Sequence, residues 1–192
     1  MQNILWYYTM NIEQHYIDLY KVMHQDKRNY QGISLMKETP NIANIVLETN
    51  SHTVLDYGCG KGNQYIESHL NILFHIPDDN IFMYDPGFDE HKKLPDRKFD
   101  GVISTDVMEH IPEEELPESL ELIFSKATKF VYLAICTSPS MATLPNGENA
   151  HCTLEDIDWW KEIVNRYRPT DILTHIRTYN QHDQSENFEV IA

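Results

Sequence analysis

A short glycine-rich turn constrains the fold of this chain more than any other feature. The segment Val54-Leu55-Asp56-Tyr57 is apolar apart from one aspartate, and Gly58, Gly60 and Gly62 follow it at every second position. This pattern predicts a buried parallel strand that turns sharply into a helix. Glycine suits such a turn because it tolerates a positive φ and lets a ligand lie against bare backbone. We expect the N–H groups at the start of the helix to meet a polar or anionic ligand.

The spacing of the glycines distinguishes between nucleotide-binding motifs. A dinucleotide-binding turn reads G-x-G-x-x-G, but here Asn63 occupies the position of the third glycine. A P-loop ends in G-K-[ST], whereas here Gly62 follows Lys61. From Asp56 the segment reads D-x-G-x-G-x-G, which resembles motif I of the class I S-adenosylmethionine-dependent methyltransferases. The alternative is a turn without a ligand, and the backbone entropy lost by three glycines argues against it.

Two further segments extend this resemblance over about residues 50 to 136. Asp85 ends the next predicted strand and precedes Pro86. A carboxylate at this edge of an α/β sheet can accept hydrogen bonds from ribose hydroxyls, although an aspartate that simply begins a turn is the alternative. Residues 99–111, FDGVISTDVMEHI, are similar to a segment of small-molecule methyltransferases that reads roughly F-D-x-V-x-x-x-x-V-x-E-H-I.

The resemblance implies S-adenosylmethionine as the cofactor and a role for each matching residue. Motif I would hold the methionine part, Asp85 the ribose, and residues 105–107 would border the adenine or the sulfonium. The cofactor-binding positions are therefore Asp56, Gly58, Cys59, Gly60, Gly62, Asp85, Pro86, Thr105, Asp106 and Val107. Only about a dozen residues separate Asp85 from Phe99, too few for the family's next helix and strand. The adenine contact is therefore unassigned, and Leu94-Pro95-Asp96 is the expected remnant of that strand.

Two histidines are the candidates for acid–base chemistry. Methyl transfer is an in-line displacement in which positioning supplies much of the rate, and a general base assists an O or N acceptor of high pKa. We expect His110, His151 and Asp106 to be catalytic. The alternatives are that His110 caps or packs a helix, and that His151 is an exposed residue before a helix capped by Thr153, with Asp156 completing the capping pattern.

Substrate contacts are expected from two regions outside the motifs. The polar loop after the fourth predicted strand contains Asn149 and His151, and a loop of this length in a compact domain is often functional. Aromatic residues Tyr16, Tyr20 and Tyr30 are expected to cover the crevice as a lid, unless they are the core face of an appended helix. No spacing such as H-x-x-x-H occurs, so we predict no metal site.

Strands that alternate with helices predict a doubly wound, Rossmann-like, mostly parallel sheet in a single domain. Residues 1–48 would form an N-terminal helical cap and residues 49–192 the core, with the family's usual third strand shortened or missing. The predicted strands are Val54–Tyr57, Ile81–Tyr84, Phe99–Thr105 and Phe130–Cys136, followed by an antiparallel hairpin of Asp171–Tyr179 and Phe188–Ile191. The predicted helices are Trp6–Met23, Ser34–Leu47 with a potential break at Pro40, Asn63–Phe74, Pro117–Ala127, and Leu154–Tyr167 with Trp159, Ile163 and Val164 in the core.

Composition limits the partners and the compartment. The net charge is −15, from 15 basic and 30 acidic residues, which disfavours binding to a phosphate backbone. The chain also lacks the N/D-P-P-[YF] segment of amino-group DNA methyltransferases at residues 104–107. No apolar stretch is long enough to span a bilayer, no export signal is recognisable, and three scattered cysteines favour the cytoplasm.

These observations predict methyl transfer to an O or N atom of a small polar metabolite, with no nucleic-acid or membrane partner. A non-catalytic protein that binds S-adenosylmethionine as a partner subunit or sensor is the alternative. The oligomeric state is left open.

Overall fold

The structure is a computed structural model that describes residues 14–67, 69 and 73–191. In these residues a sheet of six strands has the order β2-β1-β3-β4-β5-β6. Neighbouring strands from β2 to β5 are parallel, and β6 runs antiparallel to β5. The strands are β1 (Val54–Tyr57), β2 (Ile81–Tyr84), β3 (Phe99–Thr105), β4 (Ala127–Cys136), β5 (Leu173–Tyr179) and β6 (Glu186–Ile191). The predicted α/β class and the terminal antiparallel hairpin are confirmed.

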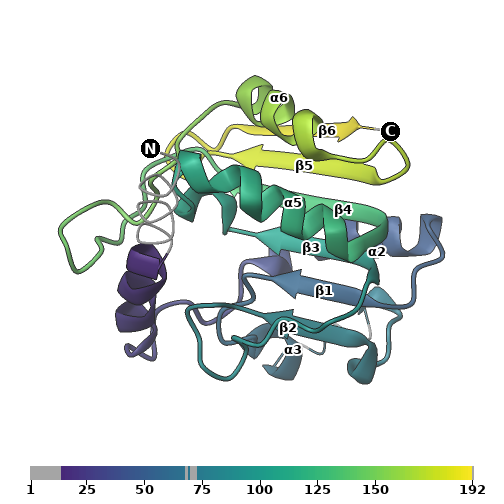
Figure 1. Ribbon diagram of the computed structural model, residues 1–192, viewed down its shortest axis with the longest axis horizontal. Helices are drawn as coiled ribbons and strands as arrows, with labels where there is room; N and C mark the ends of the chain where they lie inside the picture. Colours follow the sequence, from purple (N-terminus) through teal and green to yellow (C-terminus); the bar gives the residue numbers. More distant parts are fainter. Residues whose placement is uncertain (1–13, 68, 70–72, 192) are drawn as a thin grey trace, which may run out of the picture.

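Helices cover both faces of the sheet (Figure 1). One apolar core lies beneath α5 (Leu116–Lys126) and α6 (Ile157–Tyr167), and the other beneath α2 (Leu35–Glu48). Strand β4 supplies both cores because successive side chains of a strand point to opposite faces. Val131, Leu133 and Ile135 lie in the first core, whereas Phe130, Tyr132 and Ala134 lie in the second. Both faces of the central strand are therefore dry, as a parallel sheet requires.

Helix α2 is continuous through Pro40, so the potential break does not occur. A proline inside a helix removes one backbone hydrogen bond and crowds the preceding turn. The apolar side chains of Leu35, Ile42, Ile45 and Val46 are buried against the sheet, and this burial offsets the loss.

The helix after the glycine turn is shorter than the sequence predicts. Helix α3 spans Asn63–Glu67, and His69 has a φ of 49°, which a continuous right-handed helix cannot contain. Residues 73 and 74 are helical again, so the prediction of one continuous helix Asn63–Phe74 is wrong at His69, and residues 68 and 70–72 lie outside the described residues.

The last helix starts three residues later than expected. Helix α6 begins at Ile157 because the Asp156 side chain caps it by accepting a hydrogen bond from Trp159 N at 3.0 Å. Thr153 instead donates its hydroxyl to the Ile111 carbonyl at 2.7 Å. The predicted cap at Thr153 is wrong, and Trp160 rather than Trp159 is the fully buried tryptophan.

Three short 3₁₀ helices complete the described core: η1 (Asp78–Asn80), η2 (Met108–His110) and η3 (Glu113–Glu115). Residues 14–24 are helical, and the earlier part of the predicted helix Trp6–Met23 lies outside the described residues. Residues 85–98 contain turns and no strand, so the strand expected to be missing is absent there. No helix in the described part of the chain has the length and apolarity needed to cross a membrane.

Candidate active site

A cavity of about 490 Å³ opens where β1, β2 and β3 end. The arrowheads of β1 and β3 point toward the purple helix of residues 14–24 (Figure 1), which supplies part of the cavity wall. The chain leaves β1 toward β2 on one side, and β3 lies on the other side. Open α/β sheets bind their ligands at this kind of switch in strand order. The predicted residues in the wall are Tyr16, Tyr20, Tyr30, Gly58, Gly60, Asp85, Pro86, Thr105, Asp106, Val107, His110 and His151.

The glycine turn is fixed against the neighbouring strand. Gly58, Gly60 and Gly62 all have a positive φ, of 82°, 59° and 65°, which explains why glycine stands at these positions. The Tyr84 carbonyl at the end of β2 accepts hydrogen bonds from Gly58 N at 2.7 Å and Cys59 N at 3.2 Å. The turn is thus positioned by the main chain of the sheet.

The start of α3 is occupied by the chain itself. Lys61 N, Asn63 N and Gln64 N donate to the carbonyls of residues 30, 31 and 32 at 3.0, 3.0 and 3.1 Å. A Cβ atom added to Gly32 would lie 2.3 Å from the Cys59 carbonyl oxygen, so the two backbones are in direct contact. The expectation that these N–H groups meet a ligand is wrong. The part of the turn that faces the cavity is Gly58 and Gly60.

Four predicted site residues do not line the cavity. Asp56 is 1 % exposed and accepts a hydrogen bond from the Tyr65 hydroxyl at 2.8 Å. Cys59 is buried, and Gly62 packs on the Met83 sulfur. The Asn149 side chain accepts hydrogen bonds from Ser140 N and His151 N, both at 2.9 Å, so it holds the loop together. These residues support the wall from behind.

Asp85 joins the glycine turn to the end of β2. Its Oδ2 accepts a hydrogen bond from Gly60 N at 2.9 Å, and its Oδ1 accepts one from Gly87 N at 2.8 Å. His24 Nε2 lies 3.6 Å from Oδ1. A carboxylate offers about four lone-pair positions, so Asp85 keeps the capacity to accept hydroxyl donors from the cavity.

The opposite wall carries two histidines in edge-to-face contact, with ring centroids 4.7 Å apart. His110 Nδ1 lies 2.7 Å from the Ala150 carbonyl oxygen, and His151 Nδ1 lies 2.6 Å from the Ser138 carbonyl oxygen. Because a carbonyl can only accept, both Nδ1 atoms carry a proton, and in the neutral form of each ring the lone pair is therefore on Nε2. His151 is only 7 % exposed, so the alternative of an exposed histidine is wrong.

The segment after β3 positions a third polar group. Asp106 has a φ of 57°, and its carboxylate accepts a hydrogen bond from the Tyr179 hydroxyl of β5. Burial raises the pKa of the Asp106 carboxyl, and the Tyr179 hydrogen bond partly opposes this change. The aspartate is therefore held at the cavity by a residue 73 positions later in the chain.

A comparison with protein-family models assigns the fold to a known family. The model described as a methyltransferase domain matches residues 24–189. The chain is a class I methyltransferase. No curated protein and no solved structure matches it. The matched range contains the glycine turn, Asp85 and both histidines, whereas Tyr16 and Tyr20 of the N-terminal helix precede it.

Four tyrosines of the methyltransferase line the cavity, and the three that the sequence predicts there, Tyr16, Tyr20 and Tyr30, differ in what their hydroxyls do. The Tyr16 hydroxyl donates to Glu148 Oε2 at 3.0 Å. The Tyr20 hydroxyl lies 3.0 Å from the His110 carbonyl and 2.9 Å from the Ala150 carbonyl. The Tyr30 hydroxyl is buried and has no hydrogen-bond partner among the described residues. Among these three, Tyr30 is thus the tyrosine with a hydroxyl available to a ligand.

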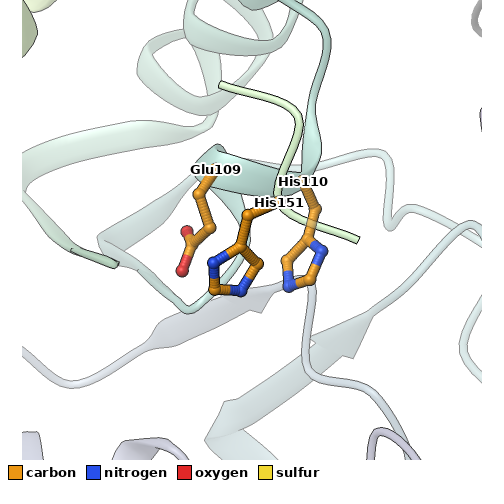
Figure 2. A group of neighbouring side chains, drawn as sticks. All are labelled: Glu109, His110 and His151. Atoms are coloured by element: carbon orange, nitrogen blue, oxygen red, sulfur yellow. The ribbon is translucent and has the colours of Figure 1, made fainter. Parts of the chain in front are cut away.

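Sequence reasoning missed three residues of the methyltransferase site: Glu109, Tyr179 and His24. Glu109 precedes His110 and is fully buried beside the histidines (Figure 2). Its position in the E-H-I segment was the available signal. Tyr179 and His24 carry no such signal, because each belongs to a strand or helix whose pattern predicts packing alone.

Proposed function

We propose that this protein transfers the methyl group of S-adenosylmethionine to an O or N atom of a small polar metabolite. The observation that carries the proposal is the single cavity that unites the glycine turn, Asp85 and the histidine pair. Its volume of about 490 Å³ lies within the usual range of small-molecule sites, about 300 to 1,000 Å³.

The cavity residues fit the cofactor in shape and charge. Gly58 and Gly60 present backbone without side chains, and Asp85 has acceptor capacity for the two ribose hydroxyls. The wall carries three carboxyl groups, those of Asp85, Asp106 and Glu115, and its Arg28 is paired with Asp26 at 2.7 Å. An acidic wall attracts a sulfonium cation. Bound S-adenosylmethionine supplies an electrophilic methyl group on sulfur.

The histidine wall provides the chemistry on the acceptor side. Burial, with His151 as the second cause, lowers the pKa of His110 to about 3. His110 is therefore neutral at physiological pH but only a weak base, so its Nε2 can accept a hydrogen bond from the acceptor, and His151 Nε2 is the candidate to receive the proton. The half-buried rings of Tyr20 and Tyr30 cover this side, and such covering excludes water from the reacting groups.

We also infer a cytoplasmic setting and a soluble, small-molecule partner. Cys59, Cys136 and Cys152 are all free thiols, as is usual in a reducing compartment. The net charge of −15 disfavours a nucleic-acid partner.

Calorimetric titration with S-adenosylmethionine and with its demethylated product tests the cofactor. We expect both to bind, and Asp85→Ala to weaken binding by about 100-fold, while Asp89→Ala in the same turn leaves it unchanged because Asp89 is exposed and pairs with Lys92. Transfer is tested by incubating the protein with labelled cofactor and the small-molecule fraction of a cell extract. Lack of cofactor binding contradicts the proposal, and binding without labelled product favours the non-catalytic partner or sensor.

A further inference from the structure

Three side chains from two distant segments meet beside the cavity. Glu109 and His110 belong to η2, and His151 comes from the loop after β4 (Figure 2). One potential ligand atom from each of them lies within 4.8 Å of the other two. The segments are tied together by the main chain, because Cys152 N and Thr153 N donate to the Glu109 carbonyl at 2.8 and 3.1 Å. The cluster is therefore a fixed part of the fold.

The histidines are oriented as metal ligands are. In metal sites the second ring nitrogen of a ligating histidine usually donates to a carbonyl or carboxylate, which fixes the tautomer and the ring orientation. Here Nδ1 of His110 donates to Ala150 O, and Nδ1 of His151 donates to Ser138 O. Both Nε2 atoms are thus lone-pair donors in rings that cannot rotate freely.

The side chain of Glu109 supplies an independent indication that this cluster can bind a cation. Its side chain is 0 % exposed. Oε1 accepts a hydrogen bond from Cys136 N at 3.0 Å, whereas Oε2 is buried and has no hydrogen-bond partner among the described residues. A buried polar oxygen left without a partner destabilises the folded protein, and more so if it is charged. A carboxylate oxygen of Glu109 lies within 4.8 Å of a ligand atom of each histidine, and the three side chains lie side by side (Figure 2). A cation held between the carboxylate and the two rings would therefore satisfy the unpartnered oxygen.

We propose that Glu109, His110 and His151 bind one divalent transition-metal ion through Oε2 and the two Nε2 atoms, with its remaining positions open to the cavity. Two imidazoles and one carboxylate form a donor set that suits Zn²⁺, Mn²⁺, Fe²⁺ or Co²⁺. Three protein ligands and an open position are typical of a catalytic rather than a structural site. With metal–ligand bonds of about 2.1 Å, the ligand atoms of a tetrahedral site lie about 3.4 Å apart, so small side-chain rotations close the cluster around the ion.

This site narrows the acceptor class, an extension that rests on the proposed function. A metal ion with open positions binds an oxygen acceptor and makes its hydroxyl more acidic. The hydroxyl proton leaves to solvent when the oxygen binds the ion. The oxygen then forms a bond to the methyl carbon as the carbon–sulfur bond breaks, and sulfur keeps the electron pair as a neutral thioether. The geometry thus favours a hydroxyl compound, and it assigns the two histidines to holding the ion instead of receiving the proton.

Titration of the full chain with Co²⁺ after treatment with a chelator tests the site, because the visible absorption of Co²⁺ reports its ligands without any methyl transfer. We expect saturation at about one equivalent, displacement by Zn²⁺, and an affinity reduced about 100-fold or more in Glu109→Gln and His151→Ala. His175→Leu is the matched control, because His175 is buried in β5 and its ring nitrogens have no hydrogen-bond partner in the described part of the chain.

Two further measurements keep the result interpretable. Circular dichroism shows whether each variant is folded, and X-ray absorption of the wild-type zinc complex must show scattering from two imidazoles. The absence of stoichiometric binding, or equal binding by folded Glu109→Gln, overturns the proposal. Calorimetry with S-adenosylmethionine in the presence of chelator tests the proposed function separately from the metal site. Cofactor binding without metal binding overturns the metal site alone, whereas loss of cofactor binding contradicts the proposed function.

Discussion

The two walls of the cavity are constructed differently. The wall at the glycine turn consists of main chain, positioned by hydrogen bonds to Tyr84 and to residues 30–32. The wall at the histidines consists of side chains from η2 and from the loop after β4, and it is oriented by the carbonyls of Ser138 and Ala150. The wall at the glycine turn tolerates few substitutions, because its backbone conformation requires glycine. Side-chain positioning allows the wall at the histidines to change while the wall at the glycine turn stays the same.

The largest expected effect is on the free energy of unfolding, and it comes from Asp56, which lies beneath the glycine turn. Burial raises the pKa of the Asp56 carboxyl from 3.8 to about 7. A carboxyl with a raised pKa stabilises the fold at low pH, and this stability is lost as the pH rises from about 4 to about 7. At about 1.4 kcal/mol per pH unit, the loss is on the order of 4 kcal/mol. We expect Asp56→Asn to remove this pH dependence of the free energy of unfolding. Urea unfolding of the wild-type protein and the variant between pH 4 and pH 8 measures it. Parallel curves for the two proteins would contradict a buried, neutral Asp56.

The next effect tests the contact between the N-terminal segment and the turn. Gly32 has a φ of 69°, and an added Cβ would lie 2.3 Å from one backbone atom and 2.7 Å from another. We expect Gly32→Ala to lower the free energy of unfolding by about 3 kcal/mol, from backbone strain together with overpacking. Gly147→Ala is the control, because Gly147 has a φ of 92° but no atom within 4 Å of an added Cβ. It should cost about 1 kcal/mol, and equal losses in urea unfolding would show that Gly32 does not pack on the turn.

The independence of the two walls is tested by a pair of substitutions. Asp85→Ala removes the carboxylate at the turn, and we expect it to weaken S-adenosylmethionine binding by about 100-fold, or about 2.7 kcal/mol, while Co²⁺ binding stays within about threefold. We expect Glu109→Gln to weaken Co²⁺ binding by about 100-fold while S-adenosylmethionine binding stays within about threefold. Calorimetry measures the cofactor and absorption measures Co²⁺. If either substitution weakens both ligands equally in a folded protein, the walls are coupled rather than separate.

The smallest effect is expected at Asn149. Its side chain joins Ser140 to His151 within the loop, so Asn149→Ala should weaken Co²⁺ binding by about tenfold, as the loss of an outer support usually does. Asn146→Ala is the control, because among the described residues the Asn146 side chain bonds only to Glu148 at the loop tip. Equal Co²⁺ affinities in the two variants would contradict a positioning role for Asn149.

The difference between the walls also explains which features the sequence could reveal. The three glycines directly follow β1, and Asp85 directly follows β2. Because β1 and β2 are parallel neighbours in the sheet, these residues meet at the same edge. The histidine cluster depends on the path of a loop that brings residue 151 to residue 109, and neither hydrophobic periodicity nor ligand spacing records such a path. For this reason the absence of an H-x-x-x-H pattern led to a prediction of no metal site, although three suitable donors meet in the fold.

Element boundaries were predicted less well where side chains compete with the backbone pattern. Asp156 and Thr153 are both residue types that can cap a helix. Asp156 is the cap, because the Thr153 hydroxyl is already hydrogen-bonded to the Ile111 carbonyl. The three amides at the start of α3 carried no sign in the sequence that residues 30–32 would bond to them. Contacts of this kind require knowledge of how distant segments meet.

The carbonyls of residues 30–32 have a consequence for any attempt to divide the molecule. A core fragment beginning after this segment would leave the three amide donors at the start of α3 without their carbonyl partners, and solvent or an anion would bind to them. The N-terminal segment therefore cannot be exchanged as an independent module, and a chimaera with another methyltransferase should be joined before residue 30 rather than at the first strand.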